Sequence, residues 1–227
     1  MNYIFEYHTD VGIKKETNQD SLCVKQAKTD NGDVLMAIVC DGMGGLEKGE
    51  VASSTIINTF SKWFAEELPS ILADNSPKDE IQYRWDRIIK EQNQKIAEYG
   101  RNNHIQLGST ITAMLFYDNC KFIIGHVGDS RAYHISGDKI EPLTLDQTVV
   151  ANEVRQGRLT VEQAERDPRR NVLLQCIGAS KIVKPDFIYG TAELGECYML
   201  CSDGFRHVIT NEEMLNVLSP QVSTDEE

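Results

Sequence analysis

No stretch of this 227-residue chain stays apolar for the roughly 20 residues that a membrane-spanning helix needs. The first ten residues are polar and include Glu6 and Asp10, so we expect no secretory signal. The six cysteines form no CxxC pair and have no histidine at zinc-finger spacing. These absences indicate a cytoplasmic protein with reduced thiols, and they argue against a membrane partner and against a disulfide or zinc framework.

Basic residues are also scarce. Lys and Arg number 23 against 35 Asp and Glu, which gives a net charge of -12 and a pI near 4.9. Nonspecific binding to nucleic acid or to an anionic membrane needs basic surface, so the composition argues against both. An acidic protein also repels phosphorylated substrates, unless bound divalent cations supply positive charge at the site.

What is present is typical of a globular protein, with 41% hydrophobic and 26% charged residues. The length fits one domain, and we treat residues 1–227 as a single unit. Apolar side chains recur at helical steps from Ile56 to Leu68 and from Ile81 to Tyr99, with a predicted loop at 69–79 between the two helices. Thr160, with Gln163 three residues later, predicts a capped short helix within a region of shorter helices at 146–176.

Short β-branched runs predict strands at residues 34–40, 110–117, 121–127, 131–135 and 197–201. The turns that join neighbouring runs are short, which implies antiparallel hairpins rather than parallel crossovers. Strands with helices on the outside predict an α+β layered fold.

Four aspartates stand at the ends of apolar runs: Asp20, Asp41, Asp129 and Asp203. Aspartate is a poor strand residue, and an ionised carboxylate in apolar surroundings is costly unless it is paired or bound to metal. A single Asp-Gly after a strand is usually only a turn. Four aspartates at such positions are harder to explain as turns alone. If the strands lie side by side, the four carboxylates converge and repel one another unless cations lie between them.

Carboxylate oxygens in such an arrangement select Mg²⁺ or Mn²⁺ rather than zinc. The phrase Asp41-Gly42-Met43-Gly44-Gly45 fits this, since glycines let the backbone approach a ligand or expose a carbonyl to a metal. A flexible turn is the alternative interpretation. The phrase is not a P-loop, because no Gly-Lys-Ser/Thr follows it.

The sequence resembles the protein phosphatase 2C family of metal-dependent serine/threonine phosphatases, in its compact bacterial form. The similarity runs from about Thr9 to about Phe205. The matching phrases appear in the family's order, at residues 12–20, 39–45, 49–53, 108–110, 127–131, 143–146, 170–178 and 200–204.

The resemblance implies a four-layer α-β-β-α sandwich of two antiparallel sheets, with metals at one end. Asp41 would bridge two catalytic cations with the help of the Gly42 carbonyl, and Asp203 would bind one of them. Asp20 would lie at or just behind these ligands, and Asp129 resembles an aspartate that helps to hold a third, weaker metal. Residues 147–170 resemble the family's flap, a variable segment near the active site.

Two bound cations can share a water, lower its pKa and neutralise charge on the phosphoryl oxygens. The expected reaction is therefore hydrolysis of phosphoserine and phosphothreonine by a water that bridges two divalent cations, with no covalent intermediate. No CxxxxxR loop of the cysteine phosphatases is present. The expected partners are phosphorylated proteins and a cognate serine/threonine kinase, and the protein is expected to be a monomer that binds no nucleic acid.

The chain departs from the family pattern at four places. Lys15 stands where the family has a phosphate-binding arginine, and lysine lacks the bidentate fork. Gln19 replaces a frequent glutamate, and Met43 replaces the histidine of eukaryotic members. The final strand with its Asp-Asn pair is not found, and residues 218–227 end in a polar tail, so we expect either a shortened chain or a natural form with an incomplete metal site.

His126 is expected to be a core residue rather than a ligand. Three functional hypotheses stay open from the sequence. They are an active phosphoprotein phosphatase, a non-catalytic metal- or partner-binding relative, and a two-metal nuclease or small-molecule phosphoesterase.

Overall fold

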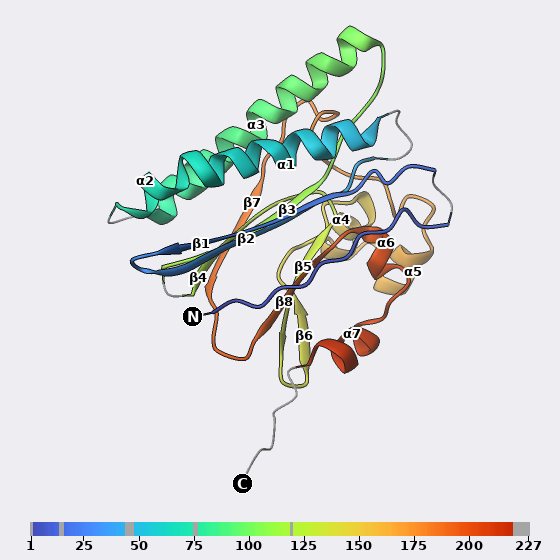
Figure 1. Cartoon of the computed structure of the whole chain (residues 1–227). Coiled ribbons are helices and arrows are strands. Elements are labelled where there is room, and N and C mark those ends of the chain that lie inside the picture. Colours follow the sequence, from blue (N-terminus) through green and yellow to red (C-terminus); the bar gives the residue numbers. More distant parts are fainter. Residues whose placement is uncertain (1, 14–15, 44–47, 75–76, 119, 220–227) are drawn as a thin grey trace.

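The computed structural model describes residues 2–13, 16–43, 48–74, 77–118 and 120–219. Its centre is two antiparallel sheets, which lie between helices (Figure 1). The larger sheet has the order β1-β2-β3-β4-β7 and consists of β1 (Ser21–Thr29), β2 (Gly32–Cys40), β3 (Ile111–Tyr117), β4 (Lys121–Val127) and β7 (Asp186–Thr191). The smaller sheet has the order β6-β5-β8 and consists of β6 (Lys139–Pro142), β5 (Arg131–Ser136) and β8 (Cys197–Cys201). The predicted α+β class is confirmed.

The outer face of the larger sheet is covered by α1 (Gly49–Glu66), α2 (Leu68–Leu72) and α3 (Pro77–Asn103) (Figure 1). The apolar stripe predicted for the first helix is buried, and Trp63 packs edge-on against Trp85 of α3 at 5.6 Å between ring centroids. Tyr99 was expected in the stripe of the second helix, but 39% of it is exposed, whereas the neighbouring Ile96 and Gly100 are buried.

Strand β3 explains the most apolar run of the sequence, because its two faces border two different cores. Alternate residues point to opposite sides of a sheet. Ile111, Ala113 and Leu115 pack under the helices, whereas Met114 and Phe116 pack between the two sheets. Every residue of this strand is buried.

The outer face of the smaller sheet carries a thin helical layer. Helix α6 (Asp203–Arg206) follows β8, and α7 (Asn211–Leu218) follows in turn. Met214 of α7 packs with Tyr133 and Cys201 on this face. The fourth layer of the sandwich is therefore short in the described part of the chain.

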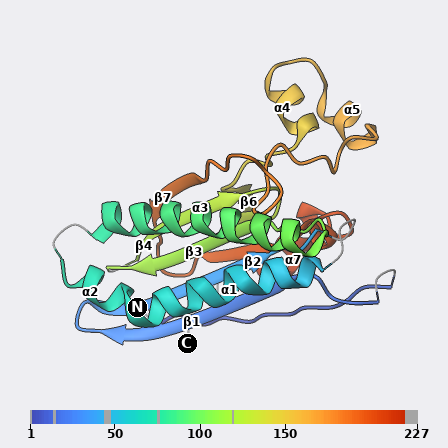
Figure 2. The same ribbon diagram turned by 90° about the horizontal axis from the view of Figure 1, so that it is seen from above.

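The predicted flap contains two short helices, α4 (Val149–Arg155) and α5 (Val161–Arg166), which stand clear of the sheets (Figure 2). Thr160 and Gln163 form the predicted capping box at the start of α5. The segment joins the body through backbone pairing, in which Val149 donates to Val172 at 2.9 Å and Leu174 donates to Gln147 at 2.7 Å.

Three strands were missed, namely β1, β6 and β7. β1 is half-exposed and rich in polar residues, so its apolar signal is weak, and β6 has only four residues. The predicted loop at 69–79 is partly wrong, because α2 ends at Leu72 and α3 already begins at Pro77. Proline fits the first helical turns of both, where no amide partner is needed. No helix within the described ranges is long and apolar enough to cross a membrane.

Candidate metal centre

Asp20 and Asp41 lie next to each other because of the β1–β2 register. Ser21 of β1 is opposite Cys40 of β2, so the residue before β1 and the residue after β2 lie side by side at the same end of the strands. Two aspartates that are 21 positions apart along the chain are thus brought together by a single hairpin. This end of the sheet is where the sequence predicted the site.

Asp203 reaches the same place from the other sheet. It follows β8, and the hydroxyl of the preceding Ser202 donates to Oδ2 of Asp20 at 2.7 Å. This contact joins the end of the smaller sheet to the beginning of β1. The three aspartates that the resemblance assigned to the catalytic centre, Asp20, Asp41 and Asp203, are therefore assembled from two sheets.

The backbone of Asp41 is held in place by Thr110. The Asp41 amide donates to the Thr110 hydroxyl at 3.0 Å, and the Thr110 amide donates to the Asp41 carbonyl at 2.9 Å. Both peptide groups are satisfied inside the protein, so the Asp41 side chain starts from a fixed position.

Gly42 has no room for a side chain. A Cβ atom there would lie 2.3 Å from the carbonyl oxygen of Gln19 and 2.5 Å from that of Gly49. The Gly42 amide donates to the Gln19 carbonyl at 3.1 Å. This hydrogen bond holds the segment before β1 against the turn that contains Gly42. The glycine is thus needed for close packing of three backbone segments around Asp41.

The surroundings of Asp41 are strongly negative. Burial, the charges of Asp20 and Asp203, a side-chain hydrogen bond with Asp203 and the charge of Asp129 raise the pKa of Asp41 to about 9. A hydrogen bond between two carboxyl groups requires a proton on one of them. A divalent cation supplies the same positive charge and lets both carboxylates ionise.

The donor set fits a hard divalent cation. Oxygen ligands suit Mg²⁺ or Mn²⁺, and such ions keep several waters rather than an all-protein cage. Among the residues that the structure describes, no three histidine, cysteine, aspartate or glutamate side chains are placed to hold a metal ion. The side chains would therefore have to move closer together when a cation binds. A cation here would draw on the carboxylates of Asp20, Asp41 and Asp203, on the carbonyl of Gly42 and on water.

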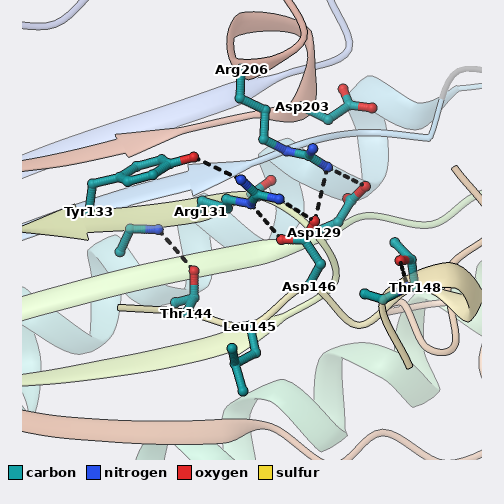
Figure 3. Close-up of polar contacts among 12 residues, drawn as sticks. Asp129, Arg131, Tyr133, Thr144, Leu145, Asp146, Thr148, Asp203 and Arg206 are labelled. Atoms are coloured by element: carbon teal, nitrogen blue, oxygen red, sulfur yellow. Dashed lines mark hydrogen bonds and ion pairs between the residues drawn. The ribbon is translucent and has the colours of Figure 1, made fainter. Parts of the chain in front are cut away.

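Asp129 has a different environment from the other three aspartates (Figure 3). One guanidinium nitrogen of Arg206 lies 3.3 Å from Oδ2 of Asp129 and 3.4 Å from Oδ2 of Asp146. Arg131 makes a two-pronged ion pair with Asp146 at 2.7 and 2.8 Å. Arg206 and Arg131 link Asp129 and Asp146 into a continuous chain of ion pairs beside the Asp41 cluster (Figure 3). Asp203 makes no ion pair with this chain, but its charge raises the pKa of Asp129.

Two further expectations concern single residues. Lys15, the predicted phosphate-binding residue, lies outside the described residues, as do Gly44 and Gly45. His126 is completely buried, and its ring nitrogens face the Thr112 hydroxyl at 3.0 Å and the Leu145 carbonyl at 3.2 Å. It is a core residue, as expected.

Sequence reasoning missed Arg206 and Ser202. Ser202 precedes Asp203 and has no pattern of its own. Arg206 lies three positions after Asp203 on α6, so helical spacing could have placed it near that carboxylate. Its contacts with Asp129 and Asp146 are long-range and could not be inferred from spacing.

Comparisons with known proteins identify the family of this chain. The family model "Protein phosphatase 2C" matches residues 12–226. The serine/threonine phosphatase stp of Listeria welshimeri is 30% identical over 223 residues, which cover 97% of this chain and 85% of the relative.

Solved structures give the same result. The serine/threonine phosphatase of S. agalactiae is 31% identical with a TM-score of 0.82, and the match covers 97% of this chain and 85% of that one. The catalytic domain of the serine threonine protein phosphatase PstP in complex with two manganese ions is 27% identical with a TM-score of 0.74, and the match covers 92% and 81% of the two chains. The chain therefore belongs to the protein phosphatase 2C family of metal-dependent serine/threonine phosphatases.

Proposed function

We propose that this chain hydrolyses phosphoserine and phosphothreonine in proteins by direct attack of water on phosphorus, with Asp20, Asp41, Gly42 and Asp203 holding two divalent cations. The observation that carries the proposal is that Asp20, from the larger sheet, and Asp203, which follows the smaller sheet, both lie beside Asp41, whose surroundings are strongly negative. Bound divalent cations would activate the attacking water and neutralise charge on the phosphoryl oxygens.

The residues of the chain have separable tasks in this proposal. Asp41 is rigidly placed by Thr110 and would be shared between the cations. Asp203 would bind one cation, and Asp20, oriented by the Ser202 hydroxyl, would bind directly or through water. The Gly42 carbonyl would complete the set, since only glycine fits at that position.

The metal is proposed to be Mn²⁺ or Mg²⁺, because both prefer oxygen ligands and tolerate bound water. A manganese complex of the relative PstP supports this choice. Lys15 is proposed to contact the substrate phosphate as a point charge. Residues 147–170 are proposed to act as a flap that limits substrate access, and the projection of α4 and α5 from the body supports that role (Figure 2).

Phosphorylated proteins are the proposed partners, together with a serine/threonine kinase, since that reaction class must supply the substrate. We propose that the chain works in the cytoplasm as a monomer, in signalling by reversible phosphorylation. The free thiols of Cys23, Cys40, Cys176, Cys197 and Cys201 support a reducing compartment.

A phosphothreonine peptide tests the proposal most directly. The chain should release inorganic phosphate in the presence of Mn²⁺ and stop when EDTA is added. A peptide-free blank and the substitution D41N serve as controls. Release that continues in EDTA would overturn the metal assignment. Metal binding without any release would favour the non-catalytic alternative.

A further inference from the structure

Asp129 is buried and Asp41 is half-buried, but only Asp129 has an arginine beside it. Asp129 is 5% exposed, and its carboxylate lies 3.3 Å from the guanidinium of Arg206. The charges that act most strongly on Asp41 are all negative. A buried carboxylate needs a positive partner, and Asp129 already has one within the protein.

Arg206 is itself nearly enclosed by this contact. Its side chain is only 11% exposed, and the same nitrogen also faces Asp146, whose side chain is 11% exposed. Arg131 pairs with both carboxylate oxygens of Asp146. The four side chains carry two positive and two negative charges, so the network balances its own charge, although the nearby Asp203 adds negative charge that acts on Asp129.

A divalent cation on Asp129 would have to displace Arg206 from this position. The displaced guanidinium would be left largely buried beside a new dication, and both burial without a partner and like-charge repulsion oppose that. The network therefore disfavours a metal on Asp129, whereas the unpaired negative charge around Asp41 favours one.

We infer that Arg206 is the built-in cation of the Asp129–Asp146 position, so that this chain takes no divalent cation at Asp129. The inference rests on the proposed two-metal centre, and it removes the third, weaker metal that the family resemblance implied. In place of an exchangeable ion, the chain has a covalently attached charge.

This arrangement also has a mechanical consequence. Arg206 lies on the short helix that begins with Asp203, and Asp146 directly precedes the flap. The Asp146 carbonyl in addition accepts a hydrogen bond from Arg155 of α4 at 3.1 Å. The Arg206 contact thus links the segment that carries Asp203 to the base of the proposed flap.

Manganese binding tests the inference without relying on activity. The metal-free chain is titrated with MnCl₂, and free Mn²⁺ is read from its electron paramagnetic resonance signal, which gives the number of bound ions. The proteins compared are the wild type, D129N, R206M, R206K and the double variant R206M/D129N. Circular dichroism and thermal unfolding establish that each is folded.

The wild type, D129N and R206K should bind the same number of Mn²⁺ ions with unchanged affinity. R206M should bind one ion more, and R206M/D129N should lose that ion again. A lost ion in D129N alone would overturn the inference, because Asp129 would then be a ligand despite Arg206. An unchanged ion count in R206M would overturn it as well.

The comparison of D129N with the wild type decides the question alone if R206M does not fold. Failure of the proposed function looks different from failure of this inference. A wild-type chain that binds no Mn²⁺ at all contradicts the two-metal centre, and the inference falls with it. A wild-type chain that binds Mn²⁺ but loses one ion in D129N contradicts only the assignment of Arg206.

Discussion

At the scale of single residues, identical side chains acquire opposite properties from their neighbours. Burial and three carboxylates raise the pKa of Asp41 to about 9, whereas Asp129, also buried and near Asp203, reaches only about 6 because Arg206 opposes the shift. For Asp146 burial alone would raise the pKa, but the hydrogen bond and charge of Arg131 outweigh it and lower the pKa. The nearest cation decides which carboxylate needs a metal.

Replacing Asp41 tests the centre of the proposed site. D41N should lower turnover of a phosphothreonine peptide by about a hundredfold or more, because an amide cannot supply the charge that the cations need. Folding should be retained, since Asn has the same shape and the backbone contacts with Thr110 remain. Steady-state kinetics with circular dichroism measure both effects.

Asp30 provides a matched control, because it is an exposed aspartate in the turn at the opposite end of the same β1–β2 hairpin. D30N should leave turnover unchanged. Equal activity of D41N and D30N would show that Asp41 holds no catalytic metal.

His126 should make the stability of the chain depend on pH. Burial lowers the pKa of His126 below its ordinary range, and the nearby Asp186 and Asp146 offset this only in part. The native state thus binds the proton less readily than the unfolded state. The contribution of His126 to stability is therefore present above the unfolded pKa and is lost as pH falls below it.

Urea unfolding in EDTA at about pH 8 and about pH 5.5 measures this difference. The wild type should lose more stability on acidification than H126Q. The contributions of carboxylates to this loss are the same in both proteins, so they cancel in the comparison. H8Q, which alters an exposed histidine, should behave as the wild type does. An identical pH dependence for H126Q and the wild type would contradict the neutral, buried state of His126.

At the scale of elements, the flap depends on one side chain at its base. Gln147 is 7% exposed. Its side-chain oxygen accepts hydrogen bonds from the Gly128 amide at 2.8 Å and from the Gln175 side chain at 2.9 Å. Its amide nitrogen donates to Asp186 at 2.7 Å. A single glutamine thus joins the start of the flap to β7 and to the turn before β5.

Replacing Gln147 should loosen the flap. Q147A leaves the buried Gly128 amide without its partner, so the free energy of unfolding should fall by about 1–3 kcal/mol. Local opening should also speed limited proteolysis between residues 147 and 170. Urea denaturation and timed trypsin digestion measure the two effects.

The substitution Q156A is the control, since Gln156 lies in the same segment but is exposed. It should change neither quantity measurably. Equal stability and equal digestion of Q147A and the wild type would show that Gln147 does not anchor the flap.

At the scale of the whole molecule, the proposed centre lies where the two sheets meet. Asp20 and Asp41 belong to the larger sheet, and Asp203 follows the smaller one. Cations that bind all three aspartates would connect the two sheets at this end. The Ser202 hydroxyl already connects them there by donating a hydrogen bond to Asp20. Metal binding should therefore stabilise the complete fold.

Mn²⁺ should raise the thermal midpoint of the wild type and should not raise that of D41N. At a hundredfold excess over the dissociation constant, one bound ion stabilises the native state by about 2.7 kcal/mol. For a chain of this size that corresponds to a rise of roughly 5–10 °C in Tm. Differential scanning fluorimetry with Mn²⁺ and then EDTA measures the shift and its reversal. An equal rise in both proteins would place the bound ion elsewhere.

Much of the fold could be predicted from the sequence because its signals are local. The stripe of α1, the all-apolar β3 and the Thr160–Gln163 cap each arise from spacings within one element. The polar strand β1 and the four-residue β6 were missed, since neither has a strong apolar period.

The sequence by itself determined the family and the strand ends that carry Asp41, Asp129 and Asp203, and it led to the proposed preference for oxygen-bound divalent cations. These follow from residue types and their order along the chain. Only the tertiary structure decided that Asp129 is paired with Arg206 while Asp41 is surrounded by carboxylates. Charge pairing in a buried site depends on distances between residues that are remote along the chain, and those distances exist only once the two sheets have packed.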